Sequence, residues 1–410
     1  MPISLRARIV YPVDRLPIEG GVVTIDGERI VAVEAASQAG GTVRDLGDVA
    51  LVPGFINAHT HLEFSHLRAP LGRPGMPLVE WLPLAIAEWQ NRSHSAESSI
   101  ASGTQESLFA GTCAIGEIAT ADPAAYPTDA AVALTPFLEV IGFSRARAAS
   151  AFASVQERLA QRGLAQRGRS SFLEKSCVPF VGLSPHAPYT VSPELVGKLV
   201  QLAREQGLPV AMHLAESAEE IEFLSAGTGP FRDLLDARSM WDPEAIPLGS
   251  RSLDYLRLLA DAPRALVIHG NYLDRDERAF LAAHADRMSL VYCPRTHAYF
   301  QHPPYPLAEL LTAGVRVVLG TDSRASNPDL SLLGEIRHVA RSHPAVPADA
   351  ILNMATLSAA QALGCDDECG SITPGKLANL IALPLRSNSL AELLAGSANP
   401  TAIWLRGREV

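Results

Sequence analysis

The sequence predicts an α/β protein built around a (β/α)8 TIM-like barrel, and two patterns lead to this prediction. Apolar runs that end in polar residues alternate with helical stretches, which is typical of a parallel sheet. There are eight such runs, and five of them end in a histidine or an aspartate, as expected where strand ends converge on the functional face of a barrel. The runs are Leu51–His61, Gly111–Ile118, Ala131–Ile141, Val178–His186, Pro209–His213, Ala265–His269, Met288–Cys293 and Val315–Asp322. An open doubly wound sheet also alternates, but does not ordinarily direct eight strand ends at one point.

Helices are expected between these strands. Leu195, Leu199 and Leu202 recur at helical spacing, which predicts a helix over Pro193–Gln206 that stops at Gly207. A second helix is expected over Leu307–Thr312. The Gly- and Pro-containing excursion Ser225–Ala262 lies between strands five and six, where a barrel commonly carries a segment over its active-site mouth. We therefore expect a substrate lid there.

The two ends of the chain predict a smaller β unit. Short strands are expected over Arg8–Tyr11, Gly21–Ile25 and Arg29–Val33, with Asp26-Gly27 as a hairpin turn. Strand-like pieces return at Leu380–Leu383 and Ala402–Leu405, after a helical stretch that ends at Leu363. We expect residues 1–52 and 364–410 to form one composite small β domain, and residues 53–363 to form the catalytic barrel.

Composition excludes several classes of partner. The net charge is −10, whereas nucleic acids and anionic membranes select basic surfaces. No window approaches 18 uninterrupted apolar residues, so no membrane span is expected, and the N-terminus lacks a signal-like segment. The five cysteines are scattered, as in a reducing compartment. We expect a cytoplasmic enzyme that acts on a small molecule. A second copy of the chain, in a homodimer, is a further candidate partner.

Histidines and carboxylates stand at the ends of the predicted strands. His59 and His61 are two apart and therefore share one face of strand one. His213 ends strand five and Asp322 ends strand eight. Because the carboxyl ends of barrel strands converge, three imidazoles and one carboxylate can hold a zinc-like ion and leave a position for water.

The same strand ends supply groups that move protons. A metal ion lowers the pKa of bound water, and Asp322 can accept a proton from that water. Glu216, three residues beyond His213, can carry that proton to a substrate. His269, at the end of strand six, can position the water or stabilise developing charge. We expect these three residues to be catalytic.

The lysines indicate how many ions are bound. Barrel hydrolases with two bridged metals usually need a strand-end lysine that becomes the bridging carbamate. The three lysines are Lys175 before strand four, Lys198 within a helix and Lys376 in the tail. None is placed at a strand end, which predicts one metal ion.

The motifs resemble those of the amidohydrolase superfamily over nearly the whole chain. The resemblance runs from the segment Leu51–His61 to Gly370–Leu380, where Asn379 stands in place of the more common aspartate. His213-Leu214-Ala215-Glu216 is similar to the H-x-x-E motif of the mononuclear aminohydrolases, which deaminate purine and pyrimidine rings. The resemblance implies one divalent ion, zinc or iron, held by His59, His61, His213 and Asp322.

Two further segments resemble a subgroup. Ser184–Thr190 is similar to a segment of relatives that act on adenine nucleosides, which implies that His186 contacts the substrate. The segments Cys293–Phe300 and Gly320–Asn327 resemble aminodeoxyfutalosine, S-adenosylhomocysteine and methylthioadenosine deaminases. Arg295 departs from the asparagine-containing version of that segment, so recognition of the ribose or the tail is expected to differ.

Other functions remain open at this stage. One is hydrolysis of a carbon–nitrogen bond in a lactam-like ring, or of a triazine or guanine; Glu216 favours deamination over these. Another is an inactive barrel kept for binding, although none of the expected residues is missing. We expect the segment Trp81–Trp89 after strand one to be a loop, and surface charge is the favoured interpretation of its Glu88, as it is of Glu139, Arg145 and Arg147. Of the remaining histidines, His297, just past strand seven, is the first to test.

Overall fold

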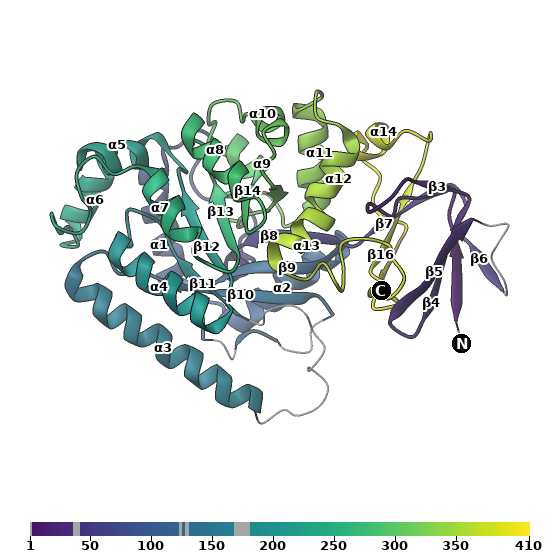
Figure 1. Ribbon diagram of the computed structural model, residues 1–410, viewed down its shortest axis with the longest axis horizontal. Coiled ribbons are helices and arrows are strands. Elements are labelled where there is room, and N and C mark those ends of the chain that lie inside the picture. Colours follow the sequence, from purple (N-terminus) through teal and green to yellow (C-terminus); the bar gives the residue numbers. More distant parts are fainter. Residues whose placement is uncertain (1, 36–41, 123–124, 128–130, 168–180) are drawn as a thin grey trace.

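The chain folds into a parallel β-barrel surrounded by helices, with a smaller β unit beside it (Figure 1). This computed structural model describes residues 2–35, 42–122, 125–127, 131–167 and 181–410. Eight parallel strands pair in sequence order, which confirms the predicted fold class. They are β8 (Phe55–Thr60), β9 (Thr112–Ala119), β10 (Ala133–Val140), β11 (Gly182–Pro185), β12 (Val210–Leu214), β13 (Ala265–His269), β14 (Met288–Tyr292) and β15 (Val317–Leu319).

The first predicted strand is two strands in the structure. The apolar run divides at Gly54 into β7 (Val49–Pro53), which belongs to the small β unit, and β8 of the barrel. The chain passes closely packed neighbours at this point, because a Cβ on Gly54 would lie 2.8 Å from the Cys113 sulfur. Both strands are buried, so the sequence carries no polar interruption between them. Residues 178–180 of the fourth predicted strand lie outside the described residues.

Fifteen helices accompany the strands in the described part of the chain. They are η1 (Leu62–Phe64), α1 (Leu78–Asn91), α2 (Ala96–Phe109), α3 (Arg145–Arg167), α4 (Pro193–Gln206), α5 (Ala218–Ala226), α6 (Pro230–Ala237), α7 (Ser252–Leu259), α8 (Arg275–Ala283), α9 (Pro294–Tyr299), α10 (Leu307–Thr312), α11 (Leu332–Ser342), α12 (Ala348–Met354), α13 (Leu357–Leu363) and α14 (Leu390–Ala395). The predicted helices Pro193–Gln206 and Leu307–Thr312 have the predicted bounds. None of the described helices is long and apolar enough to cross a membrane.

The small β unit draws on both ends of the chain. One sheet contains β1 (Ile3–Arg6), β4 (Gly21–Asp26), β5 (Arg29–Ala35) and β6 (Val43–Asp45); the other contains β2 (Ile9–Val10), β3 (Ile18–Glu19), β7, β16 (Leu380–Pro384), β17 (Ala402–Leu405) and β18 (Arg408–Glu409). N-terminal β7 pairs antiparallel with C-terminal β16 over five residue pairs. The two termini therefore lie in the same unit, at one side of the barrel (Figure 1).

The barrel closes where the segment after β15 meets β8. The amide nitrogens of Thr321 and Asp322 both donate to the carbonyl oxygen of His59, at 3.0 and 3.1 Å. The side-chain amide of Asn57 also donates to the Thr321 hydroxyl at 2.7 Å. Gly320 allows this approach, because a Cβ there would lie 3.0 Å from His59 atoms. Closure therefore brings Asp322, which follows the last barrel strand, next to His59 on the first barrel strand.

Candidate metal-dependent active site

The strand ends bring the predicted histidines and Asp322 together. An oxygen of Asp322 lies 3.5 Å from Nε2 of His59 and 3.7 Å from Nε2 of His61. The His213 ring lies 5.0 Å from that of His59 and 5.4 Å from that of His61, centre to centre. Two groups of ligand atoms are each compact enough to hold a metal ion, and they share His59. The groups are His59, His61 and Asp322, and His59, His213 and His269.

The histidine nitrogens are arranged to bind a cation. Both ring nitrogens of His59 are buried, and neither has a hydrogen-bond partner among the residues that the structure describes. A buried polar atom without a partner is costly unless a ligand satisfies it. His213 Nδ1 lies 3.1 Å from the carbonyl oxygen of His186, which can only accept, so the proton sits on Nδ1 and Nε2 keeps its lone pair. These residues fit a divalent metal ion with imidazole and carboxylate ligands.

Burial keeps the imidazoles neutral. It lowers the pKa of His59 and His61 well below the ordinary value, and neighbouring histidines lower both further. The pKa of His213 is also lowered by burial, although Asp322 opposes the shift. Neutral imidazole is the form that binds metals, so the site is prepared for a cation before it arrives.

Asp322 is held in place by its own neighbours. The Ser326 hydroxyl donates to Oδ2 at 2.8 Å, and the Thr60 hydroxyl donates to the Asp322 carbonyl at 2.7 Å. The backbone of Asp322 is left-handed, with φ at 55°. Ala215 and His269 share this rare conformation, at 53° and 69°. Such backbones persist where surrounding contacts fix them, and they cluster at functional sites.

Glu216 stands beside the cluster, next to His269. Its carboxyl oxygen lies 3.4 Å from Nε2 of His269, and both side chains are buried. Burial raises the pKa of Glu216 well above the ordinary value, and nearby Asp322 and Glu220 raise it further. The environment therefore favours the protonated carboxyl, which can give a proton to a substrate.

Glu220, which is not among the residues predicted for the site, fixes the turn that carries Glu216. One of its oxygens accepts from the amide of Ala215 at 2.7 Å, and the other from the amide of Glu216 at 3.0 Å. Ser217 caps α5 in the same turn by accepting from the Glu220 amide. A Ser followed three residues later by Glu is the pattern of a helix start, and it was the available signal.

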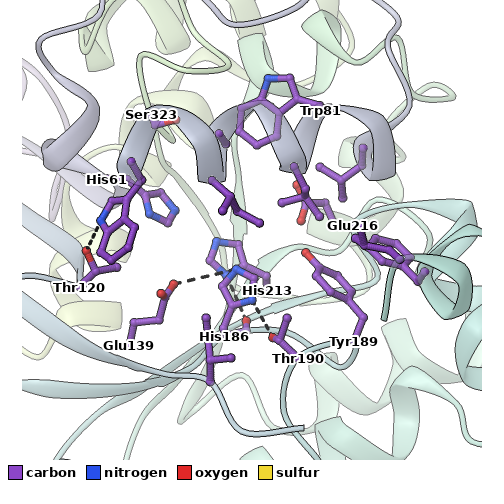
Figure 2. A pocket seen from close by; sticks show the side chains of 18 of the residues that line it. His61, Trp81, Thr120, Glu139, His186, Tyr189, Thr190, His213, Glu216 and Ser323 are labelled. Atoms are coloured by element: carbon purple, nitrogen blue, oxygen red, sulfur yellow. Dashed lines mark hydrogen bonds and ion pairs between the residues drawn. The ribbon is translucent and has the colours of Figure 1, made fainter. Parts of the chain in front are cut away.

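The cluster opens into a cavity of about 560 Å³. His61, His186, His213, Glu216, His269 and Asp322 line it on the barrel side. The opposing wall is largely apolar and comes from α1 and α6, including Trp81, Leu82, Phe231 and Leu235. Figure 2 shows Trp81 across the cavity from His186 and His213. The helix α6 belongs to the excursion for which a lid was predicted, whereas α1 occupies the Trp81–Trp89 segment that was expected to be a loop.

Glu139 lines this cavity, so its interpretation as surface charge was wrong. It lies on β10, and its carboxyl oxygen is 3.9 Å from Nε2 of His186. Burial raises the pKa of Glu139 to about 7, with a smaller contribution from Glu63. Glu139 lies near the end of the predicted strand Ala131–Ile141, as the predicted metal ligands lie at the ends of theirs, and that position was the signal for it. Arg147 also lines the cavity, from α3.

Four other residues lie away from the cavity lining. Glu88 binds His66 at 2.9 Å, and Arg145 binds Glu244 at 2.8 Å. Arg295 binds Glu335 at 2.6 Å and Asp329 at 2.7 Å, so it braces the segment after β15 and does not reach the cavity. His297 packs edge-on against Tyr292 and Tyr305. A role for Arg295 in recognition of ribose or tail therefore has no support in this geometry.

Residues 50–410 match the amidohydrolase family. The chain belongs to this family. A curated relative, the 5-methylthioadenosine/S-adenosylhomocysteine deaminase of Moorella thermoacetica, is 29% identical over 405 residues, covering 93% of this chain and 85% of the relative. The assigned family agrees with the resemblance identified from the sequence motifs.

Solved structures of two deaminases superpose on the chain. An adenosine deaminase from Xanthomonas campestris with bound zinc is 25% identical, with a TM-score of 0.76, and the match covers 99% of this chain and 92% of that one. The aminofutalosine deaminase of Helicobacter pylori, in complex with methylthio-coformycin, has a TM-score of 0.82 and 22% identity over the full length of both chains. At that identity the second likeness shows the fold alone.

Proposed function

We propose that the protein is a metal-dependent deaminase that hydrolyses the exocyclic amine of an adenine-type nucleoside and releases ammonia. The observation that carries the proposal is the buried Glu216–His269 pair beside the cluster of His59, His61, His213 and Asp322. A protonated carboxyl next to a water-activating site is what hydrolytic deamination of a ring requires. The names of the relatives support the same chemistry.

One divalent metal ion would be held by His59, His61, His213 and Asp322. Zinc is the favoured metal, because an adenosine deaminase of similar structure was solved with zinc bound. When bound, such an ion supplies Lewis acidity and lowers the pKa of water toward neutrality. His269 is assigned beside the metal site because its Nε2 is directed at Glu216.

The protein residues then handle the protons. Glu216 gives its proton to the ring nitrogen next to the amine-bearing carbon, which makes that carbon more electrophilic. Asp322 accepts a proton from the attacking water as the carbon–oxygen bond forms, and His269 stabilises the charge that develops on the oxygen. That proton then passes to the amine, the carbon–nitrogen bond breaks with release of ammonia, and the carboxylate of Glu216 takes the hydroxyl proton as the ring carbonyl forms.

The cavity supports a substrate of nucleoside size. Its volume of about 560 Å³ lies within the range of small-molecule sites. The apolar wall from α1 and α6 suits a hydrophobic substituent on the sugar, as in methylthioadenosine, although aminodeoxyfutalosine and S-adenosylhomocysteine belong to the same class. Arg147 and Arg238 also line the cavity and could meet an acidic tail.

The test is an ammonia-release screen with purified, zinc-loaded protein. The panel holds adenosine, methylthioadenosine, S-adenosylhomocysteine, aminodeoxyfutalosine, guanine, an aminated triazine and a lactam-like ring. Ammonia from the adenine nucleosides, with kcat/KM at least tenfold above the other compounds, is the expected result. Opening of the lactam ring releases no ammonia and is followed by chromatography of the product. Turnover of the lactam alone would replace deamination by ring hydrolysis, and turnover of none would favour a binding barrel.

A further inference from the structure

Glu139 and His186 form a second polar pair in the cavity, apart from Glu216. They come from the adjacent strand ends of β10 and β11, and their side chains are 13% and 16% exposed. The separation of 3.9 Å between the Glu139 oxygen and His186 Nε2 exceeds a direct hydrogen bond. In Figure 2, Glu139 lies on one side of His186 and His213, and Glu216 on the other.

The hydrogen bonds of Thr190 determine which atom His186 offers to the cavity. The Thr190 hydroxyl gives its proton to the carbonyl oxygen of Ala187 at 3.0 Å. It therefore accepts from His186 Nδ1 at 2.8 Å, which assigns the proton of the neutral ring to Nδ1. Nε2 of His186 is left with a lone pair that is directed toward Glu139.

The Glu139 carboxyl has no protein donor within hydrogen-bond distance among the described residues. Arg158 donates to its backbone carbonyl at 3.4 Å rather than to its side chain. Glu139 and His186 thus present acceptors side by side on the barrel side of the cavity, opposite the apolar wall from α1 and α6. A buried acceptor without a donor is costly, so a bound molecule that brings two adjacent donors gains from both.

We propose that Glu139 and His186 together recognise the vicinal hydroxyl groups of the substrate's sugar. The inference rests on the proposed function, in which Glu216 and the metal ligands take the base. The sugar then extends toward Glu139, and its two hydroxyls supply the donors that this pair lacks. Glu139 is thereby a specificity-determining residue that selects ribosides over deoxygenated nucleosides.

The test compares the binding of inosine and 2′,3′-dideoxyinosine to the zinc-loaded protein by calorimetry. Neither compound has an amine to lose, so binding is measured without turnover. We expect inosine to bind about 10- to 100-fold more tightly, because the deoxygenated analogue leaves two acceptors unpaired. In the variant Glu139→Leu the two dissociation constants should differ by less than threefold.

A matched control comes from a second Glu–His pair. Glu88 binds His66 outside the cavity lining, and Glu88→Leu should keep the wild-type preference for inosine. Equal binding of both compounds to the wild-type protein, or absence of binding of either, overturns the inference. A preserved preference in Glu139→Leu overturns it as well. The ammonia screen is separate: silence there with a clear preference for inosine would refute deamination and leave this subsite standing.

Discussion

Buried ionisable side chains determine the chemistry at the mouth of the barrel. Burial keeps His59 and His61 neutral, so both can bind a cation, while it favours the protonated form of Glu216. One physical cause, removal from water, therefore prepares the proposed metal ligands and the proposed proton donor at the same place. Neither effect requires the substrate to be present.

Replacement of Glu216 by Gln tests the role of its proton. The amide keeps the shape of the side chain but has no acidic proton, so we expect kcat to fall by about 10²- to 10⁴-fold. Metal content, measured by elemental mass spectrometry, should stay at the wild-type level because Glu216 is not an assigned ligand. Activity near that of the wild type would refute the assignment.

Glu139 gives a prediction for the pH dependence of stability. Its pKa is raised to about 7 in the folded protein, from an ordinary value of 4.5. Between these values the folded protein retains a proton that the unfolded chain releases, so this group lowers stability as pH rises through that window. Glu139→Gln removes the effect. Urea unfolding at pH 5 and pH 8 measures this effect. Between the two pH values, the free energy of unfolding of the variant should rise relative to that of the wild type by at most about 3 kcal/mol. A difference that is independent of pH would contradict this.

At the scale of elements, sequence patterns predicted strands well where one element spans one apolar run. The run Leu51–His61 misled because β7 and β8 are both buried and meet at Gly54 without a polar break. The segment Trp81–Trp89 was expected to be a loop, yet α1 runs through it with Pro83 inside the helix. Tertiary packing of its apolar residues at the cavity wall favours the helix α1, and such packing cannot be predicted from local sequence preference.

The turn between β12 and α5 provides a prediction at this scale. The two oxygens of Glu220 hold the amides of Ala215 and Glu216, and Gln at position 220 could accept from one of them only. We expect Glu220→Gln to lower kcat by about 10- to 100-fold through displacement of Glu216, with a smaller change in KM. Steady-state kinetics on the best substrate would measure both constants.

The control for this turn is Glu219→Gln, on the same helix. Glu219 makes no hydrogen bond to the turn in the described structure and should keep wild-type kinetics. Equal losses in both variants would indicate a general effect of charge at the start of α5. An unchanged kcat in Glu220→Gln would show that the turn holds its shape without the paired acceptor.

At the scale of the molecule, barrel closure assembles the site. Thr321 and Asp322 meet His59 across the last strand junction, so the metal site depends on the complete barrel. The sequence predicted this meeting from strand-end positions alone, because parallel strands in a barrel share one functional face. It could not predict the cavity wall, because the placement of α1 and α6 depends on tertiary contacts. Glu139 was interpreted as surface charge because the sequence does not show the cavity wall that it faces.

Metal binding should therefore be coupled to the stability of the whole barrel. An ion that binds the folded site and not the unfolded chain stabilises by about 2.7 kcal/mol when free metal is at 100 times its Kd. We expect one equivalent of metal per chain by elemental analysis, and a fall in Tm when a chelator removes it. His59→Ala should abolish both the stoichiometric metal and the effect of the chelator, because His59 belongs to both groups of ligand atoms. Two equivalents held with equal tightness would contradict the single-ion site, and a chelator-independent Tm in the metal-loaded wild type would separate metal binding from barrel closure.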